Sequence, residues 1–303
     1  MRRLRVTAPV ERVPIETHCF VTVSVAVSLL YAIVDPQTVG AAQIVVLSVL
    51  VALLGLPHGA LDPLLARRSR LYHGRRSLLL FLIGYSTLSA LIVGLWLLIP
   101  VASLIAFLMI SAAHFGSDWN AGRPAAIRIL AGVALLSLPA FRNVDHVAQL
   151  YMILSGPGAR VVATWQSAAG PFLLVGLLAV AVIASRRRLH EGVELVVAAA
   201  LALTTPPLVF FTVYFCLLHS ARHLREGFAM EREALRRPAG RVLVGGATLV
   251  PMLVAVVLLM GDAGAVLEDR LLQIVFIGLA ALTVPHILVV TMSARAGRIA
   301  RAS

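Results

Sequence analysis

The chain lacks most of what a soluble or secreted protein of its size would show. Only 13% of its 303 residues are charged, whereas 60% are hydrophobic, and the mean hydropathy is +0.94. Its two cysteines, Cys19 and Cys216, both fall in apolar runs, so neither a disulfide framework nor a cysteine metal site is expected. We interpret both as packing residues. The composition therefore predicts a protein whose solvent is lipid.

The chain also shows no linker, no low-complexity run and no obvious internal repeat that would divide it. We therefore predict one all-α domain, a polytopic transmembrane bundle over residues 1–303. Within it, 1–18 form a basic cytoplasmic N-terminus, 19–292 the bundle, and 293–303 a basic cytoplasmic tail. The basic start followed by an apolar run resembles a signal peptide, but its length and the lack of a cleavage pattern favour a retained first span.

Long apolar runs predict about ten membrane-spanning helices, since a span needs roughly 20 apolar residues. The fourth and seventh runs are short, and the seventh contains Glu194. The ten runs are 19–34, 40–58, 78–99, 101–116, 125–141, 168–185, 191–205, 207–224, 242–260 and 271–292.

The net charge of +12 comes from arginine clusters between these runs, not from one polar face, so a nucleic-acid partner is not indicated. Cytoplasmic loops gather positive charge. Ten spans with both termini inside leave only Arg142, Arg160 and Arg270 on the outer side. The prediction is a multi-pass protein of the cell (inner, cytoplasmic) membrane. An interfacial helix is expected within the outer loop 141–167, where apolar residues recur at helical spacing: Val147, Leu150, Tyr151 and Leu154.

The nine histidines divide by expected depth. Four fall in loops or at span ends and are expected to be solvated: His18, His73, His146 and His190. The other five lie in even-numbered spans at one depth, in the cytoplasmic half of the bundle: His58, His114, His219, His223 and His286. A single buried histidine is usually satisfied by a backbone carbonyl or hydroxyl, but ionisable groups gathered at one depth in a membrane indicate a functional site.

His219 and His223 are spaced i, i+4, which places both on one helix face and suits two ligands of one metal ion. Neutral imidazole binds zinc, copper, iron or nickel without carrying a charge into lipid. Asp62 and Asp118 each follow a histidine by one turn, and an aspartate there could accept the second ring N–H of that histidine. Pairing with neighbouring arginines at the interface is the equally weighted alternative.

Proline and glycine also gather near these histidines. Pro57 and Pro285 each precede a histidine, which predicts local bends. Gly55, Gly59 and Gly116 would let a backbone or a ligand approach closely, although helix packing explains them equally well.

The sequence contains four short histidine motifs between residues 55 and 288: GLPHGALD (55–62), AAHFGSD (112–118), LLHSARH (217–223) and VPHIL (284–288). In these motifs and in their order, the sequence resembles the Brp/Blh family of bacterial and archaeal β-carotene 15,15'-dioxygenases. The resemblance implies a membrane-embedded non-haem iron enzyme. It would cleave the central 15,15' double bond of β-carotene with dioxygen and release two all-trans-retinal molecules.

Carried over by position, the resemblance implies iron(II) ligands at His58, His114, His219 and His223. His286 is a further ligand or a supporting residue, as are Asp62 and Asp118. Because the substrate is a hydrocarbon dissolved in lipid, an apolar tunnel is expected near the histidines. Aromatic residues that could line it, although packing is the commoner role of such residues, are Phe115, Trp119, Phe210, Phe211, Tyr214, Phe215 and Phe276.

A transporter or channel that relays protons or passes a metal ion is the main alternative function. It predicts acids deep in the spans and a polar path through both halves of the bilayer, whereas the polar groups here stop on one side. A diiron or haem lipid desaturase or hydroxylase is less favoured, because only one closely spaced histidine pair is present. The sequence identifies neither the oligomeric state nor a retinal-binding partner such as a rhodopsin.

Overall fold

The computed structural model describes residues 13–33, 41–119, 122–260 and 266–302. The basic start up to Arg12 lies outside the described residues, as do the side chains at 41–42, 54–58 and 294–302, which include His58 and Arg295. The described residues form helices and turns, which confirms the all-α prediction. The α-helices are α1 (Ile15–Ile33), α2 (Ala41–Leu50), α3 (Asp62–Arg68), α4 (Arg75–Leu98), α5 (Pro100–Gly116), α6 (Ala125–Arg142), α7 (Val144–Ser155), α8 (Arg160–Ser185), α9 (Leu189–Thr204), α10 (Pro207–Tyr214), α11 (Ala221–Met230), α12 (Arg232–Arg236), α13 (Pro238–Met260) and α14 (Leu267–Ala302).

Seven helical segments in the described part of the chain are long and apolar enough to cross a membrane: Ile15–Ile33, Arg75–Leu98, Pro100–Trp119, Ala125–Arg142, Pro157–Ser185, Pro238–Met260 and Leu267–Ser293. They indicate a multi-pass membrane protein. The other three predicted spans, 40–58, 191–205 and 207–224, are also helical but shorter or interrupted. The count of ten therefore stays a prediction.

The interruptions have local causes. After α2, a π-helical turn, η1 (Val51–Gly55), gives way to a 3-10 helix, η2 (Leu56–Leu61), which contains Pro57. A proline ring cannot fit inside a regular α-helix without displacing its hydrogen bonds. A second π-helical turn, η5 (Phe215–Ser220), joins α10 to α11 and carries His219. Such turns occur frequently at functional sites.

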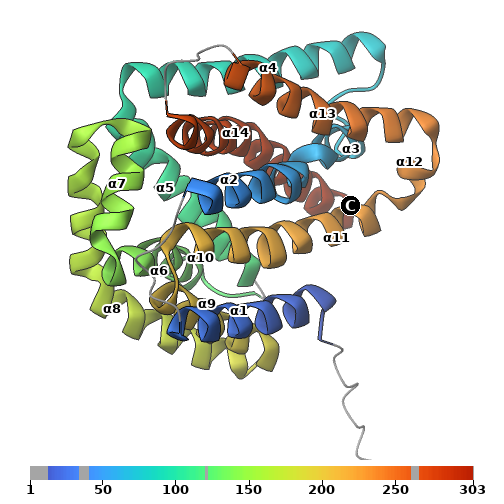
Figure 1. Ribbon diagram of the computed structural model, residues 1–303. Coiled ribbons are helices and arrows are strands. Elements are labelled where there is room, and N and C mark those ends of the chain that lie inside the picture. The colour runs from blue at the N-terminus through green and yellow to red at the C-terminus, as the bar shows by residue number, and fades with distance from the viewer. Residues whose placement is uncertain (1–12, 34–40, 120–121, 261–265, 303) are drawn as a thin grey trace, which may run out of the picture.

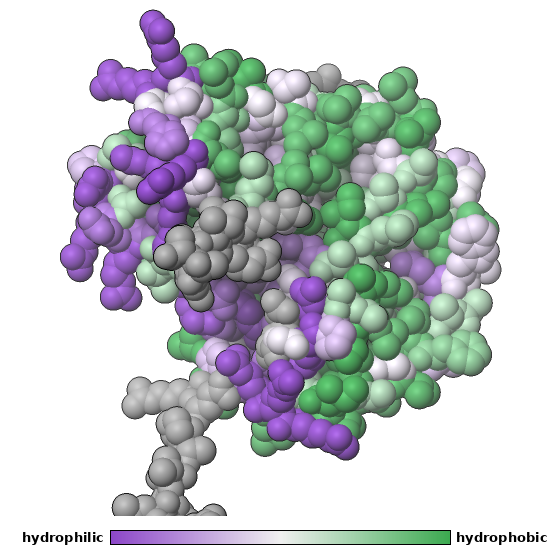
Figure 2. All heavy atoms as spheres, turned by 180° about the vertical axis from the view of Figure 1, so that it is seen from behind, coloured by the Kyte–Doolittle hydropathy of each residue, from purple (hydrophilic) through white to green (hydrophobic). Residues whose placement is uncertain are grey.

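The core and the lipid-facing surface are both hydrophobic. One cluster of buried side chains joins α1, α6, α8, α9 and α10 and includes Phe20, Leu135, Leu195 and Tyr214. Figure 2 shows hydrophobic side chains over much of the opposite face, whereas hydrophilic ones gather toward the side where α3, α11 and α12 lie in Figure 1. The chain enters α1 and leaves α14 on this same side (Figure 1).

The segment 141–167, predicted as an outer loop, contains the helix predicted for it. α7 begins at Val144, and Val147 and Leu154 are buried, as their spacing indicates. α7 packs against α8, α14 and α6. The helix is confirmed, and its interfacial position remains a prediction.

Candidate metal centre

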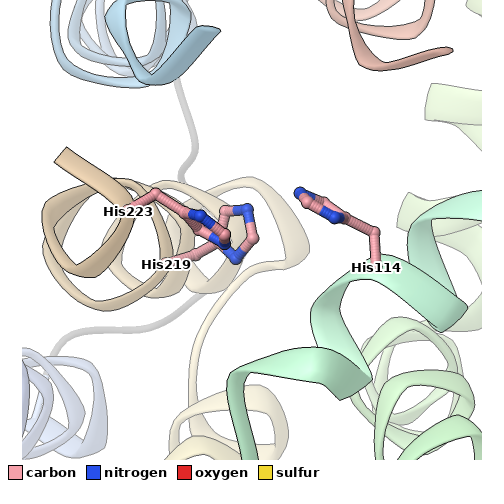
Figure 3. A group of neighbouring side chains, drawn as sticks. All are labelled: His114, His219 and His223. Carbon is pink, nitrogen blue, oxygen red and sulfur yellow. The ribbon is translucent and has the colours of Figure 1, made fainter. Parts of the chain in front are cut away.

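Three of the predicted histidine ligands converge in the folded chain. His114 comes from the end of α5, and His219 and His223 come from η5 and α11 on the facing helix (Figure 3). One ligand nitrogen from each ring lies within 4.8 Å of the others. The ring centroids of His114 lie 4.8 Å from His219 and 5.3 Å from His223. The structure thus brings together side chains more than 100 residues apart in sequence.

The ring of His286, from α14, borders this group. Its centroid lies 5.5 Å from that of His114 and 6.1 Å from that of His223. His286 is 2% exposed and His219 is fully buried. Four of the five histidines expected at one depth therefore form one cluster, and the side chain of the fifth, His58, lies outside the described residues.

The remaining histidines are not buried. His18 and His73 are exposed, and His146 and His190 are partly exposed. This agrees with the expectation that they are solvated, and it separates them from the cluster.

Asp118 connects two members of the cluster. It lies in a 3-10 turn, η3 (Ser117–Trp119), and its carboxylate oxygens are 3.0 and 3.1 Å from Nδ1 of His219 and 3.6 Å from Nε2 of His223. The hydroxyl of Tyr214 donates a 2.9 Å hydrogen bond to the same carboxylate. Since an ionised carboxylate only accepts, His219 must donate from Nδ1, which leaves Nε2 as its ligand atom.

Asp62 supports His286 in the same way. Its Oδ1 lies 2.7 Å from Nδ1 of His286, and its Oδ2 accepts a 2.9 Å hydrogen bond from the hydroxyl of Tyr85. Both aspartates are therefore paired with histidines of distant helices, whereas the i, i+4 argument placed them beside His58 and His114. The spacing thus predicted that the aspartates support histidines of the site, and the fold adds His286 and His219 as partners that the spacing does not indicate.

Two arginines that could have paired with these aspartates form ion pairs with glutamates. Arg123 pairs with Glu191 at 2.5 Å, and Arg68 lies 3.5 Å from Glu231. The side chains of Asp62 and Asp118 are each 1% exposed. These two carboxylates are buried parts of the site.

A buried ion pair lies directly behind Asp118. Glu194, fully buried in α9, accepts hydrogen bonds from Arg222 (2.6 Å), Trp119 (2.9 Å) and Thr17 (2.5 Å). Arg222 also donates to the backbone oxygen of Asp118 at 3.2 Å. This network links α1, α9 and α11 to η3.

The roles of Glu194, Arg222, Tyr85 and Tyr214 at the site were not predicted from the sequence. In the sequence, Glu194 only makes the seventh apolar run less typical of a span. An acid in an apolar run does indicate a buried partner, but only the fold identifies Arg222 as that partner.

Glycine lets α5 and α6 approach closely at the site. A Cβ added at Gly116 would collide with the backbone of Arg128, and one added at Gly132 would collide with the backbone of Ala112. Helix packing thus accounts for Gly116. Gly59 lies instead beside Asp62, Tyr85 and His286, and Gly55 lies outside the described side chains. Of the two prolines, Pro57 lies in the irregular stretch before α3, and Pro285 lies inside α14.

Four of the seven aromatic residues expected near the histidines border a cavity. Phe115 and Phe215 pack on His219, with centroids 4.7 and 5.6 Å away. Phe115 and Phe211, with Phe210 and Phe276, line a cavity of about 90 Å³. Trp119, Tyr214 and Phe215 belong to the hydrophobic core and are at most 3% exposed. Packing is the observed role of Phe215, whereas Trp119 and Tyr214 also donate hydrogen bonds to Glu194 and Asp118.

The donor set fits a transition-metal ion. Nitrogens bound to one ion at about 2.1 Å lie roughly 3.0–4.2 Å apart, and the three ring nitrogens here all lie within 4.8 Å of one another. Imidazole ligands whose other ring nitrogen donates to a carboxylate are typical of metal sites, and His219 with Asp118 has this arrangement. Imidazole nitrogens favour zinc, copper, iron or nickel, whereas magnesium and calcium prefer oxygen ligands.

Comparisons with known proteins agree on one family. The family model described as "Beta-carotene 15,15'-dioxygenase" matches residues 49–293, which include all four histidine motifs. A protein of that same description from uncultured marine bacterium 66A03 is 31% identical over 257 residues, which cover 80% of this chain and 90% of that protein. No solved structure matches the chain significantly.

Proposed function

Since the chain belongs to the β-carotene 15,15'-dioxygenase family, we propose that its histidine cluster binds the iron(II) ion with which it cleaves β-carotene. The reaction splits the central 15,15' double bond with dioxygen and gives two all-trans-retinal molecules. The observation that carries the metal proposal is the convergence of His114, His219 and His223, each from the family's motifs, within 4.8 Å.

We propose His58 as the fourth ligand, on the resemblance of its motif. His286 is either a further ligand or a residue that supports the ligands. Four neutral imidazoles leave the ion its full double charge, unlike the common site of two histidines and one carboxylate. Bound there, iron(II) would supply the activation of dioxygen.

The chain itself orients the ligands and excludes water. Asp118 holds the ring of His219 in the tautomer that presents Nε2, and Tyr214 fixes Asp118 in turn. Phe115 and Phe215 cover the ring of His219 and keep water from it. Because β-carotene carries no group to protonate, no general acid or base is required of the protein.

We also propose that the chain crosses the cell membrane ten times with both termini in the cytoplasm. The start of α1 and the end of α14 lie on one side of the molecule, which supports an even number of crossings (Figure 1). The shorter segments 40–58, 191–205 and 207–224 would supply the three crossings beyond the seven long helices. The arginine distribution supports the cytoplasmic assignment of that side.

Expression in cells that accumulate β-carotene tests the function. We expect the cells to lose their orange colour and to yield retinal on extraction, whereas His219→Ala, made at the same level, leaves the pigment intact. Elemental analysis of the purified protein tests the metal, with iron expected in the wild type. Unchanged β-carotene with folded, iron-loaded protein would contradict the activity. Cleavage by a protein that carries another metal instead would contradict the iron assignment alone.

A further inference from the structure

A large cavity adjoins the histidine cluster between α4, α13 and α14. Its volume is about 810 Å³, within the range of roughly 300–1,000 Å³ typical of small-molecule sites. Asp62 and His286 form part of its wall. Since the ring of His286 also borders His114 at 5.5 Å, the cavity ends at the candidate metal centre.

The cavity is elongated along the helices. Its wall on α13 extends from Val242 to Leu258, a length of about 24 Å at 1.5 Å per residue. α14 runs antiparallel beside α13, and Arg270 near its start donates a hydrogen bond to the backbone of Leu258. The end near Val242 is therefore the end of His286, and the end near Leu258 is that of Gln273.

The walls of the cavity suit a hydrocarbon. Apart from Asp62, Tyr85 and His286 at the site, most lining side chains are aliphatic, as in Leu82 and Val250. Two of its three walls, α4 and α13, are helices whose apolar stretches are not buried in the protein. A molecule dissolved in the bilayer could therefore reach the cavity between these helices without crossing water.

We propose that this cavity admits β-carotene from the bilayer and holds one half of the molecule while its central bond lies at the histidine cluster. The proposal rests on the function proposed above. An all-trans polyene is a straight rod, so half of it must extend in line from the point of cleavage. The long axis from His286 toward Gln273 provides such a path. A lipid acyl chain is the competing occupant.

Two glycines allow the cavity to be filled without disturbing the fold. Gly246 and Gly278 line it, and a Cβ added at either would meet no atom within 4 Å. Gly245 offers the same open space but is not among the lining residues. Leucine is also a better helix former than glycine. Gly245→Leu is therefore a matched control for Gly246→Leu.

The first experiment measures cleavage, iron content and pigment binding for these variants. We expect Gly246→Leu and Gly278→Leu to lower kcat/KM for β-carotene at least about tenfold, since overfilling a packed site is costly. Iron content should stay at the wild-type level, and less β-carotene should copurify with the iron-free protein. Gly245→Leu should stay within about twofold of the wild type.

A second pair of variants tests whether the end of the cavity near Gln273 is the end remote from the histidine cluster. Ala255→Phe fills the far end, and Val256→Phe on the neighbouring position is its control, since Val256 is 51% exposed and not a lining residue. Ala255→Phe should impair cleavage of β-carotene but spare an apo-carotenal that lacks one ring, because its shorter arm does not reach the plug.

The outcomes separate the two proposals. Normal cleavage by Gly246→Leu and Gly278→Leu, beside an active wild type, would overturn the cavity assignment and favour a lipid occupant, while leaving the metal centre intact. Equal losses for β-carotene and the apo-carotenal in Ala255→Phe would overturn the path toward Gln273. An inactive wild type would contradict the proposed function itself.

Discussion

The carboxylate of Asp118 lies 3.0 Å from Nδ1 of His219, although 101 residues separate them in the chain. Asp118 follows α5, which carries His114, whereas His219 belongs to the π-helical turn before α11. One carboxylate thus joins the two helices that supply the three converging histidines. Tyr214, one turn before His219, holds the same carboxylate from the second helix.

Asp118→Asn should weaken iron binding or turnover by about 10- to 100-fold. The amide keeps the shape of the carboxylate but loses the charge that favours the Nδ1–H tautomer of His219. Iron content and single-turnover rates measure the effect. Asp145→Asn, at a side chain that is 72% exposed, is the control. An unchanged Asp118→Asn enzyme would show that orientation of His219 does not depend on this bond.

Replacement of His58, His114, His219 or His223 with alanine should remove bound iron and abolish activity. Each change deletes a bond to the metal that the remaining imidazoles cannot replace. Elemental analysis and retinal formation are the measurements, and His73→Ala, at an exposed loop position, should behave as the wild type. Any of the four variants that keeps full iron content and normal turnover is not a ligand.

Asp62→Asn and His286→Ala should have effects that do not add. The two side chains share a 2.7 Å contact, so the double variant should be about as impaired as His286→Ala alone. Iron content decides the role of His286: loss comparable to that of His114→Ala identifies a ligand, whereas retained iron with slower cleavage identifies a residue at the substrate. Additive losses would mean that Asp62 acts independently of His286.

Glu194→Ala should destabilise the protein by about 3–5 kcal/mol, because it removes the nearest carboxylate from buried Arg222 and leaves only the more distant Glu16, at 3.8 Å. Replacing both residues, as in Glu194→Leu with Arg222→Met, should recover part of that loss, since buried ion pairs are often replaceable by apolar side chains. Thermal unfolding in detergent measures both effects. Exposed Glu233→Ala, at a side chain that is 87% exposed, is the control. A double variant no more stable than Glu194→Ala would contradict this account.

Reporters fused after Arg76 and after Arg188 should be cytoplasmic, and one fused near Gly264, a position outside the described residues, should be external. These positions follow the second, sixth and ninth predicted spans. Alkaline phosphatase and a fluorescent protein report opposite sides of the membrane. A reporter near Gly264 that is found in the cytoplasm excludes the ten-span arrangement.

The sequence alone determined the solvent, the helical class and most members of the site. Apolar runs of span length leave helices as the structure that satisfies the backbone within lipid, so the fold class followed directly. Histidines at one depth indicated a cluster, because every charged or polar group in a membrane is costly. The four histidine motifs also indicated the family, which the family model and the relative from the marine bacterium confirm.

Tertiary structure alone decided which groups meet. Spacing along one helix predicted that Asp62 and Asp118 support the histidines just before them, and only helix packing shows that His286 and His219 meet these carboxylates. The cavity between α4, α13 and α14 has no sequence signal either, since its lining residues resemble any lipid-facing helix. Hydrophobic periodicity records whether a residue avoids water. In a bilayer, lipid, protein core and cavity all satisfy that condition, so only the positions of the helices distinguish them.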